Sequence, residues 1–190
     1  GGAFELLQQM QRSMPIYQAL WQHLPKSQGM RGLLNWGMHR DADGIDFPPF
    51  PVNGSGSMVP QVPVDGGLAW FMGSSYQPDS QPERSDLANR ERNLKHLEQL
   101  LPTLATQMAA QFSAPTLQQW KGTRCVTTDR LPAVGPLENS DQPSLWLCAG
   151  MGSRGLSFSV LCAELLAARF GAEPLPIEAK LARSLDALRA

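Results

Sequence analysis

Two segments of this sequence carry residue types that could do chemistry, and the first is a run of glycines. Gly150-Met151-Gly152-Ser153-Arg154-Gly155 spaces its glycines as dinucleotide-binding loops do. Glycines at this spacing allow a tight turn, close approach of a ligand to the backbone, and close packing of a helix on a strand. No second strand with its acidic residue can follow, because Glu173-Pro174-Leu175-Pro176 breaks the chain. The run is therefore either a packing device or one wall of a ligand site whose main part lies elsewhere.

The second segment is Gly122 to Pro136, in which Arg124 stands between an apolar strand-like run and the turn Asp129-Arg130-Leu131-Pro132. The planar fork of an arginine suits the two oxygens of a carboxylate or phosphate. Arg124 is therefore either half of a partly buried ion pair or a clamp for an anionic ligand.

Other catalytic patterns are missing from the sequence. It contains no Gly-x-Ser-x-Gly elbow, no HExxH and no CxxC, so we predict neither a serine or cysteine nucleophile nor a metal site. Cys125, Cys148 and Cys162 lack metal-ligand spacing, which favours reduced core thiols in the cytosol.

The overall composition limits the class of protein to which these segments can belong. The 190 residues are 42% hydrophobic and 17% charged, with a net charge of -1, which predicts a globular domain rather than a disordered tail. A charge near zero provides no overall basic field, so a nucleic acid would need a local patch or another part of a longer protein. No apolar stretch reaches the roughly 20 residues of a membrane span, and the first residues lack a charged region followed by an apolar one, so we expect neither membrane insertion nor export. The opening Gly1-Gly2 suggests a fragment.

Hydrophobic periodicity predicts the elements that must position the two segments. Residues 3–24 have helical spacing, interrupted at Pro15. A second helix is expected from Ser85, a good N-cap, to Leu101. The runs expected to form antiparallel strands are Leu33 to Trp36, Ser57 to Val59, Leu68 to Met72 and Leu117 to Val126, and the stripe expected to bury the second helix is Leu87, Leu94, Leu97, Leu101 and Leu104.

The last part of the chain reads as strand, glycine turn and helix. Leu145 to Ala149 is a continuous apolar run of strand length, and Leu156 to Phe170 is nearly apolar all round, with Gly171 as its expected C-cap. We therefore expect an α+β fold: an antiparallel sheet with a covering helix, followed by one strand and one helix of a doubly wound domain.

Taken together, these segments resemble the C-terminal end of the D-amino-acid-oxidase class of flavoproteins, which includes glycine oxidase and sarcosine oxidase. Within that class they are most similar to the oxidoreductase half of the bifunctional enzymes of tRNA 5-methylaminomethyl-2-thiouridine biosynthesis. The elements that carry the resemblance are Arg124-Cys125, Thr128-Asp129-Arg130-Leu131-Pro132, Val134-Gly135, Gly152-Ser153-Arg154-Gly155-Leu156 and Leu161 to Ala167, with Arg31-Gly32 and Gly73-Ser74-Ser75-Tyr76 upstream.

This resemblance implies an FAD-dependent oxidoreductase acting on the wobble uridine of tRNA. Such enzymes oxidise the carboxymethylaminomethyl group, release its two-carbon acid portion and leave aminomethyl. A separate methyltransferase half that uses S-adenosylmethionine, absent from these residues, then methylates the amine. The alternatives are a small-molecule amine or amino-acid oxidase of the same class, or a non-catalytic domain that keeps the fold.

The resemblance also assigns residues and domains. It makes Arg124 the carboxylate clamp and places Gly150, Met151, Gly152, Ser153, Arg154, Gly155 and Leu156 against the flavin. A covalent flavin link at Cys125 stays open. The expected organisation is a helical lead-in over 1–28, a substrate-binding antiparallel sheet domain over 29–143, and the C-terminal portion of an FAD-binding domain over 144–190. The expected partners are tRNA and the remainder of the bifunctional chain, the expected compartment is the cytoplasm, no membrane is involved, and the fragment alone is expected to bind FAD poorly and to be inactive.

Overall fold

The computed structural model describes residues 27–138 and 145–189, so the helices predicted over 3–24 lie outside the described residues. The chain divides into two compact units, one of residues 31–123 and one containing residues 124–189. In chain order the elements are β1 (Ser27–Met38), the 3-10 helix η1 (His39–Asp41), β2 (Val52–Gly54), β3 (Gly56–Val64), β4 (Gly67–Pro78), α2 (Asp86–Leu100), α3 (Pro102–Ser113), β5 (Gln118–Thr127), β6 (Ala133–Pro136), β7 (Trp146–Ala149), α4 (Gly155–Gly171) and α5 (Ala179–Ser184).

A five-stranded sheet in the order β2-β3-β4-β1-β5 forms the first unit. β3 pairs antiparallel with β2 and with β4, and the β3–β4 hairpin turns at Asp65 and Gly66, after which Gly67 pairs with Val64. Gly66 and Gly67 have φ angles of +90° and +134°, and glycine adopts such positive values readily. The predicted α+β class with an antiparallel sheet and a covering helix is therefore confirmed.

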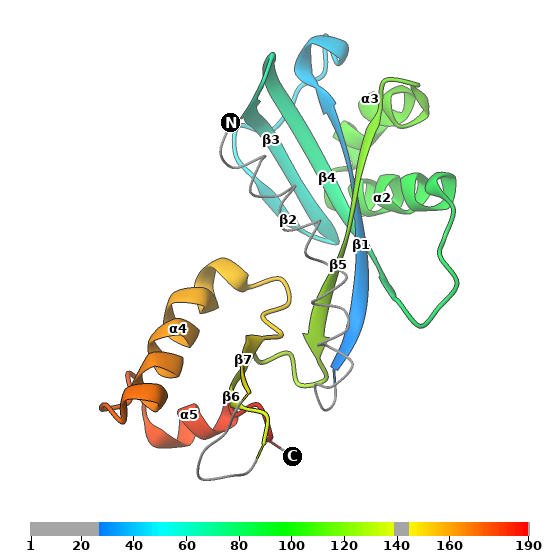
Figure 1. Cartoon of the computed structure of the whole chain (residues 1–190). Coiled ribbons are helices and arrows are strands. Elements are labelled where there is room, and N and C mark those ends of the chain that lie inside the picture. The colour runs from blue at the N-terminus through cyan, green and yellow to red at the C-terminus, as the bar shows by residue number, and fades with distance from the viewer. Residues whose placement is uncertain (1–26, 139–144, 190) are drawn as a thin grey trace. The chain divides into compact units, whose positions relative to one another are not determined.

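One face of this sheet is covered by α2 and α3, as Figure 1 shows. The core beneath the helices consists of Ala42, Met58, Trp70, Met72, Leu97, Leu104, Ala105, Met108, Phe112 and Leu117. Each of these side chains is at most 5% exposed. Burying a large apolar side chain stabilises a fold by about 1.5–3 kcal/mol, so this core is a main source of the stability of the unit.

The predicted apolar stripe of α2 is only partly right. Leu97 is fully buried, but Leu87 is 65% exposed, and Asn89 and Asn93 are buried in its place. Asn93 Nδ2 donates to Leu33 O at 3.2 Å and to Asn35 Oδ1 at 2.9 Å. The polar edge of α2 thus faces the sheet, and these bonds offset part of the cost of burying the two amides, although Asn35 Nδ2 and Asn93 Oδ1 are buried without a partner among the described residues.

The apolar stripe from Leu87 to Leu104, which the sequence analysis assigned to a single helix, is divided between two helices. α2 ends at Leu100, and Pro102 begins α3, since a proline is tolerated at the first position of a helix but not inside one. Ser85 caps α2 as predicted, accepting a hydrogen bond from Ala88 N at 3.2 Å.

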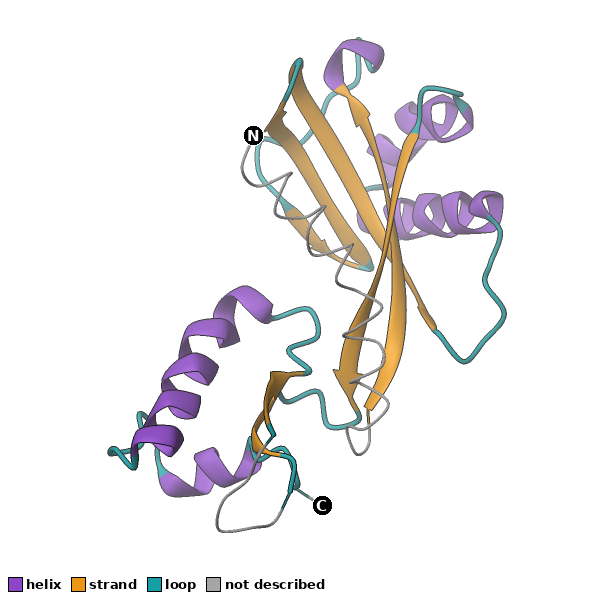
Figure 2. Ribbon diagram, in the orientation of Figure 1, coloured by secondary structure: helices purple, strands orange, loops and turns teal. Residues whose placement is uncertain are grey.

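The second unit contains a two-stranded antiparallel sheet, β6 with β7, together with α4 and α5 (Figure 2). Its core gathers Val134, Cys162, Leu165, Ala182 and Leu185. The short strand β6 was expected only as part of a turn region.

The expectation that α4 is buried all round is wrong for the described residues. Leu156 is 97% exposed, Val160 66% and Phe170 60%, so one side of the helix packs on the core and another is open. The C-cap of α4 is Ala172, one residue later than the expected Gly171, and Ala172 lies in the left-handed region at φ +50°.

None of the described helices is long and apolar enough to cross a membrane.

Candidate functional site

The glycine loop leaves strand β7 at a position that only glycine fits. Gly150 has φ +74°, and a Cβ there would approach Thr127 Cγ2 to 3.0 Å. Gly152 also has a positive φ, +57°, but a Cβ there or at Gly155 would meet no atom within 4 Å. The first glycine therefore serves packing, whereas the next two leave open space over the backbone.

The loop is joined directly to the strand that carries Arg124. Val126 of β5 forms an antiparallel bridge with Met151. Arg124 lies two residues before Val126 and so on the same face of β5. In an antiparallel pair the chains run in opposite directions, so Arg124 lies toward the Ser153 side of the loop. The structure thus brings the two predicted segments together on one bridge.

Arg154 is held by the protein itself. Its guanidinium donates to the Arg130 carbonyl and lies over the Phe158 ring, 4.9 Å from the ring centre. These contacts tie the glycine loop to the Asp129 turn, so they favour a structural role for Arg154 over the supply of charge to a ligand.

Asp129 shapes the turn that receives Arg154. Its Oδ1 accepts from Leu131 N at 2.9 Å, and its two carboxylate oxygens accept from Arg189 Nε at 2.7 Å and Nη2 at 2.9 Å. The hydrogen bond from Arg189 is the largest cause that lowers the pKa of Asp129, while partial burial acts in the opposite direction. Arg189 also donates to Leu131 O at 2.7 Å, so the C-terminal arginine closes the turn.

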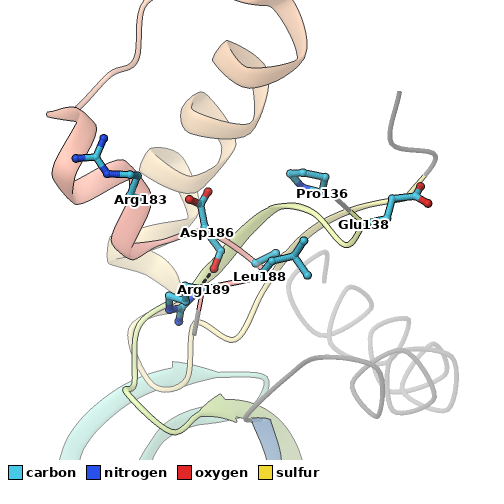
Figure 3. Close-up of a pocket in the computed structure, with 7 residues that line it drawn as sticks. Pro136, Glu138, Arg183, Asp186, Leu188 and Arg189 are labelled. Atoms are coloured by element: carbon cyan, nitrogen blue, oxygen red, sulfur yellow. Dashed lines mark hydrogen bonds between the residues drawn. The ribbon is translucent and has the colours of Figure 1, made fainter. Parts of the chain in front are cut away.

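A pocket of about 400 Å³ lies beside this turn, and it does not contain the predicted site residues (Figure 3). It is lined in part by Glu138, Arg183, Asp186 and Arg189. Asp186 pairs with Arg169 at 2.5 Å, and Arg189 pairs with Asp129. Because these two lining groups are already paired within the protein, we assign no ligand to this pocket.

Cys125 lies on the opposite face of β5 from its neighbour Arg124. It is 5% exposed and packs with Ala133 and Ala187. Burial raises the pKa of Cys148, and burial together with Cys148 raises the pKa of Cys162 to about 11. Cys125 and Cys162 are buried, as the prediction of core thiols requires, whereas Cys148 is only partly buried. Among the described residues no cluster of histidine, cysteine or acidic side chains could hold a metal ion.

The loop and the start of α4 fit one part of an FAD molecule. Helix α4 has 17 residues, and its N-cap Arg154 makes no side-chain capping hydrogen bond. A helix N-terminus of this kind favours negative charge by its dipole and its first N–H groups. A Cβ at Gly152 or Gly155 would meet no atom within 4 Å, so the backbone there is open to a ligand. That Gly150, Met151, Gly152, Ser153, Arg154, Gly155 and Leu156 contact FAD stays a prediction from the sequence.

Sequence reasoning missed Arg169 and Arg189. Arg169 donates to Val134 O and Ala182 O, at 2.6 and 2.9 Å. Ala182 lies 13 residues from Arg169, and Asp129 lies 60 residues from Arg189. Local patterns carry no signal for contacts of this range.

The sequence matches a family model described as FAD dependent oxidoreductase over residues 6–169. The tRNA 5-methylaminomethyl-2-thiouridine biosynthesis bifunctional protein MnmC of Albidiferax ferrireducens is 55% identical over 193 residues, which cover 100% of this chain and 32% of that protein. MnmC of Polaromonas naphthalenivorans is 48% identical over 83% of this chain and 24% of its own length. The chain thus spans about a third or less of these curated relatives.

Solved structures share the fold at low identity. Glycine oxidase from Geobacillus kaustophilus superposes with a TM-score of 0.63 at 17% identity, covering 87% of this chain and 40% of that one. L-Proline dehydrogenase from P. horikoshii gives a TM-score of 0.58 at 14% identity, with the same coverage of 87% and 40%.

Proposed function

Because this chain belongs to the FAD-dependent oxidoreductase family, in the part of it found in the MnmC bifunctional proteins, we propose that it is part of an enzyme that oxidises the carboxymethylaminomethyl arm of the wobble uridine in tRNA. Loss of a hydride and a proton from the arm would give an imine, and water would hydrolyse its C=N bond, which leaves aminomethyl on the uridine and releases the two-carbon acid portion as its aldehyde. In the whole protein, the other half would be a methyltransferase that uses S-adenosylmethionine and acts on the resulting amine, in the cytoplasm.

The role proposed for Arg124 is to hold the substrate. The arm is in effect a glycine attached through its nitrogen, and its carboxylate matches the guanidinium fork. Fixing the carboxylate also fixes the methylene group beside it, and orientation of this kind lowers a reaction barrier by several kcal/mol. FAD, when bound, accepts a hydride from that methylene group.

The role proposed for the glycine loop is to stabilise charge. The first N–H groups of α4 and its dipole favour an anion placed over Gly152 to Leu156. Arg154 keeps the loop in place through Arg130 and Phe158 rather than touching substrate.

One observation carries the proposal: the bridge between Val126 and Met151 joins the strand of Arg124 to the glycine loop. A carboxylate clamp and a flavin-facing loop have to lie close together for a hydride to move, and this bridge supports that arrangement.

The test uses the full-length protein loaded with FAD and tRNA that carries the carboxymethylaminomethyl group. Digestion of the tRNA to nucleosides and mass spectrometry should find that the aminomethyl form replaces the substrate nucleoside. Unchanged nucleosides, with turnover of glycine or N-methylglycine instead, would favour a small-molecule oxidase. No turnover and no releasable flavin would favour a non-catalytic domain that keeps the fold.

The 190-residue chain by itself is expected to bind FAD weakly and to be inactive. The strand β7, the glycine loop and helix α4 form only one wall of a cofactor site. The nucleotide portion of FAD needs a glycine-rich loop of its own. Calorimetric titration of the isolated chain should show weak or no binding, and tight binding would contradict this expectation.

A further inference from the structure

Three segments of the second unit meet at the turn of Asp129, namely the turn itself, the glycine loop and the residues that follow α5. Arg189 lies in the third segment and donates from Nε to Asp129 Oδ2 at 2.7 Å and from Nη2 to Asp129 Oδ1 at 2.9 Å. Its Nη2 also donates to Leu131 O at 2.7 Å. The Arg189 side chain is only 16% exposed, so water competes little for these bonds. One guanidinium therefore binds both ends of the turn.

The backbone of the turn has a conformation that needs this support. Arg130 has φ +60°, in the left-handed region that a residue other than glycine adopts only where the surrounding structure holds it there. Arg130 N donates to Thr127 O at 3.1 Å, and Thr127 Oγ1 donates to Leu131 O at 2.7 Å. Leu131 O thus accepts from both Thr127 and Arg189. Hydrogen bonds on both sides of Arg130 therefore set the direction of its carbonyl.

The Arg130 carbonyl in turn holds the glycine loop. It accepts a hydrogen bond from the guanidinium of Arg154, which is the N-cap residue of α4. Arg154 N donates to Met151 O at 3.0 Å, so the same residue also closes the loop on itself. Every step from Arg189 to the first turn of α4 is thus a hydrogen bond or a bond of the chain.

Resting on the function proposed above, we propose that Arg189 is a positioning residue, which acts through the Asp129 turn and Arg154 to hold the glycine loop in the conformation that presents the first N–H groups of α4 to FAD. In this role Arg189 touches neither flavin nor substrate. N–H groups stabilise developing charge only when they are already aimed at it, so a loop with more freedom binds and stabilises the flavin less well.

A purely structural role for Arg189 makes a different prediction. The Asp129 carboxylate is 44% exposed, so its pair with Arg189 adds little to the stability of the whole unit. The turn closed by this pair is nevertheless the one that binds Arg154. Loss of Arg189 should therefore open the glycine loop locally while the unit stays folded, because loops open at a much lower free energy than a core does.

The first measurement is hydrogen–deuterium exchange of the full-length protein, with and without added FAD. Without FAD, the amides of residues 151–158 should exchange about 2- to 30-fold faster in Arg189→Ala than in the wild type. Arg189→Lys keeps the charge but not the planar fork, so it should show a smaller increase. The control is Arg183→Ala, which removes an exposed arginine of α5 that points away from Arg189 in Figure 3, and it should leave this exchange unchanged.

The second measurement is the affinity of the same full-length variants for FAD, by titration of flavin fluorescence. Arg189→Ala should raise the Kd by about 2- to 30-fold, and Arg189→Lys should recover part of the affinity. Because Arg189 acts through Asp129, adding Asp129→Asn to Arg189→Ala should weaken binding little further. Arg183→Ala should bind FAD as the wild type does.

The outcomes separate this proposal from the one on which it rests. A wild-type protein that takes up no FAD would overturn the proposed function, whereas the exchange without FAD would still decide whether Arg189 holds the loop. Faster exchange confined to residues 129–131 and 186–189 would overturn the positioning role. Faster exchange of the loop with an unchanged Kd for FAD would also overturn it. If circular dichroism shows that Arg189→Ala does not fold, Asp129→Asn carries the same test, because it removes the charge that Arg189 binds.

Discussion

The two compact units bury their apolar residues to different extents. In residues 31–123 the core is closed, and Trp70, Met72 and Leu97 are at most 1% exposed. In residues 124–189 the longest helix leaves Leu156 and Val160 open to solvent. The first unit therefore has a closed apolar core, whereas the second has an open apolar side at the loop proposed to contact FAD.

Among the substitutions that test this comparison, removal of the central side chain of the closed core should change the free energy of unfolding most. Trp70 is 1% exposed and stacks near Phe47 and Phe112, with centroids 6.4 and 5.9 Å away. Trp70→Ala should lower the free energy of unfolding of the sheet unit by about 3–5 kcal/mol, through lost burial and the cavity left behind.

The matched change in the open helix is Leu156→Ala. Because Leu156 is 97% exposed, its removal should change the unfolding free energy by less than about 0.5 kcal/mol. Urea denaturation followed by circular dichroism measures both variants. Equal effects would show that the two units do not differ as described.

A smaller effect is expected at the glycine loop. Gly150→Ala adds a Cβ 3.0 Å from Thr127 Cγ2 at φ +74°, whereas Gly152→Ala adds one in open space at φ +57°. A non-glycine residue in this region costs about 1–3 kcal/mol, and only Gly150→Ala adds a clash to that strain. We expect Gly150→Ala to destabilise the second unit more than Gly152→Ala does.

Cysteine alkylation reports on this unit, because all three cysteines lie within it. Burial raises the pKa of Cys162 to about 11, so the folded unit should react slowly at pH 8, and Gly150→Ala should speed the reaction. Equal labelling rates for the two glycine variants would contradict the close approach at Thr127.

The smallest effect is the pH dependence of the Asp129 turn. The pKa of Asp129 is lower in the folded chain than in the unfolded chain, chiefly because of Arg189. Its stabilising contribution is therefore complete above the unfolded value of about 3.9 and is lost as the pH falls through the folded value. Its carboxylate is 44% exposed, so screening limits the contribution to about 1 kcal/mol or less.

Thermal unfolding of the wild type and of Asp129→Asn measures this contribution. The variant should be slightly less stable at pH 7, and the difference should shrink below about pH 4. A difference that stays constant down to pH 2 would contradict the role of the ion pair.

Local sequence patterns predicted the features whose causes are local. The Ser85 cap, the Gly66 turn, strand β7 and the glycine loop all follow from residues within a few positions of one another. The buried asparagines of α2 and the Arg189 contacts did not follow, because their partners are distant in the sequence. The exposed side of α4 could not be predicted from its composition. An apolar sequence shows that every face of a helix can be buried, but not which faces are.

For the candidate site, the sequence supplied the residues and the structure supplied their arrangement. Spacing alone left Arg124 as either an ion-pair partner or a clamp. The bridge from Val126 to Met151 places its strand against the glycine loop, and the Arg154 contacts give that arginine a supporting role. The stacking of Trp36 on Phe71 escaped the sequence analysis because the two rings meet only when β1 and β4 are neighbours.

The most direct test of the central claim is the rate at which a modified anticodon stem-loop reduces the FAD of the full-length protein without oxygen. We expect Arg124→Ala to slow flavin bleaching by about 100-fold, because the carboxylate loses its charged partner, and Arg124→Lys to restore part of the rate. Arg92→Ala, on α2, is the control and should leave the rate unchanged. If the flavin of Arg124→Ala is bleached at the wild-type rate, Arg124 is not the clamp that holds the arm for oxidation.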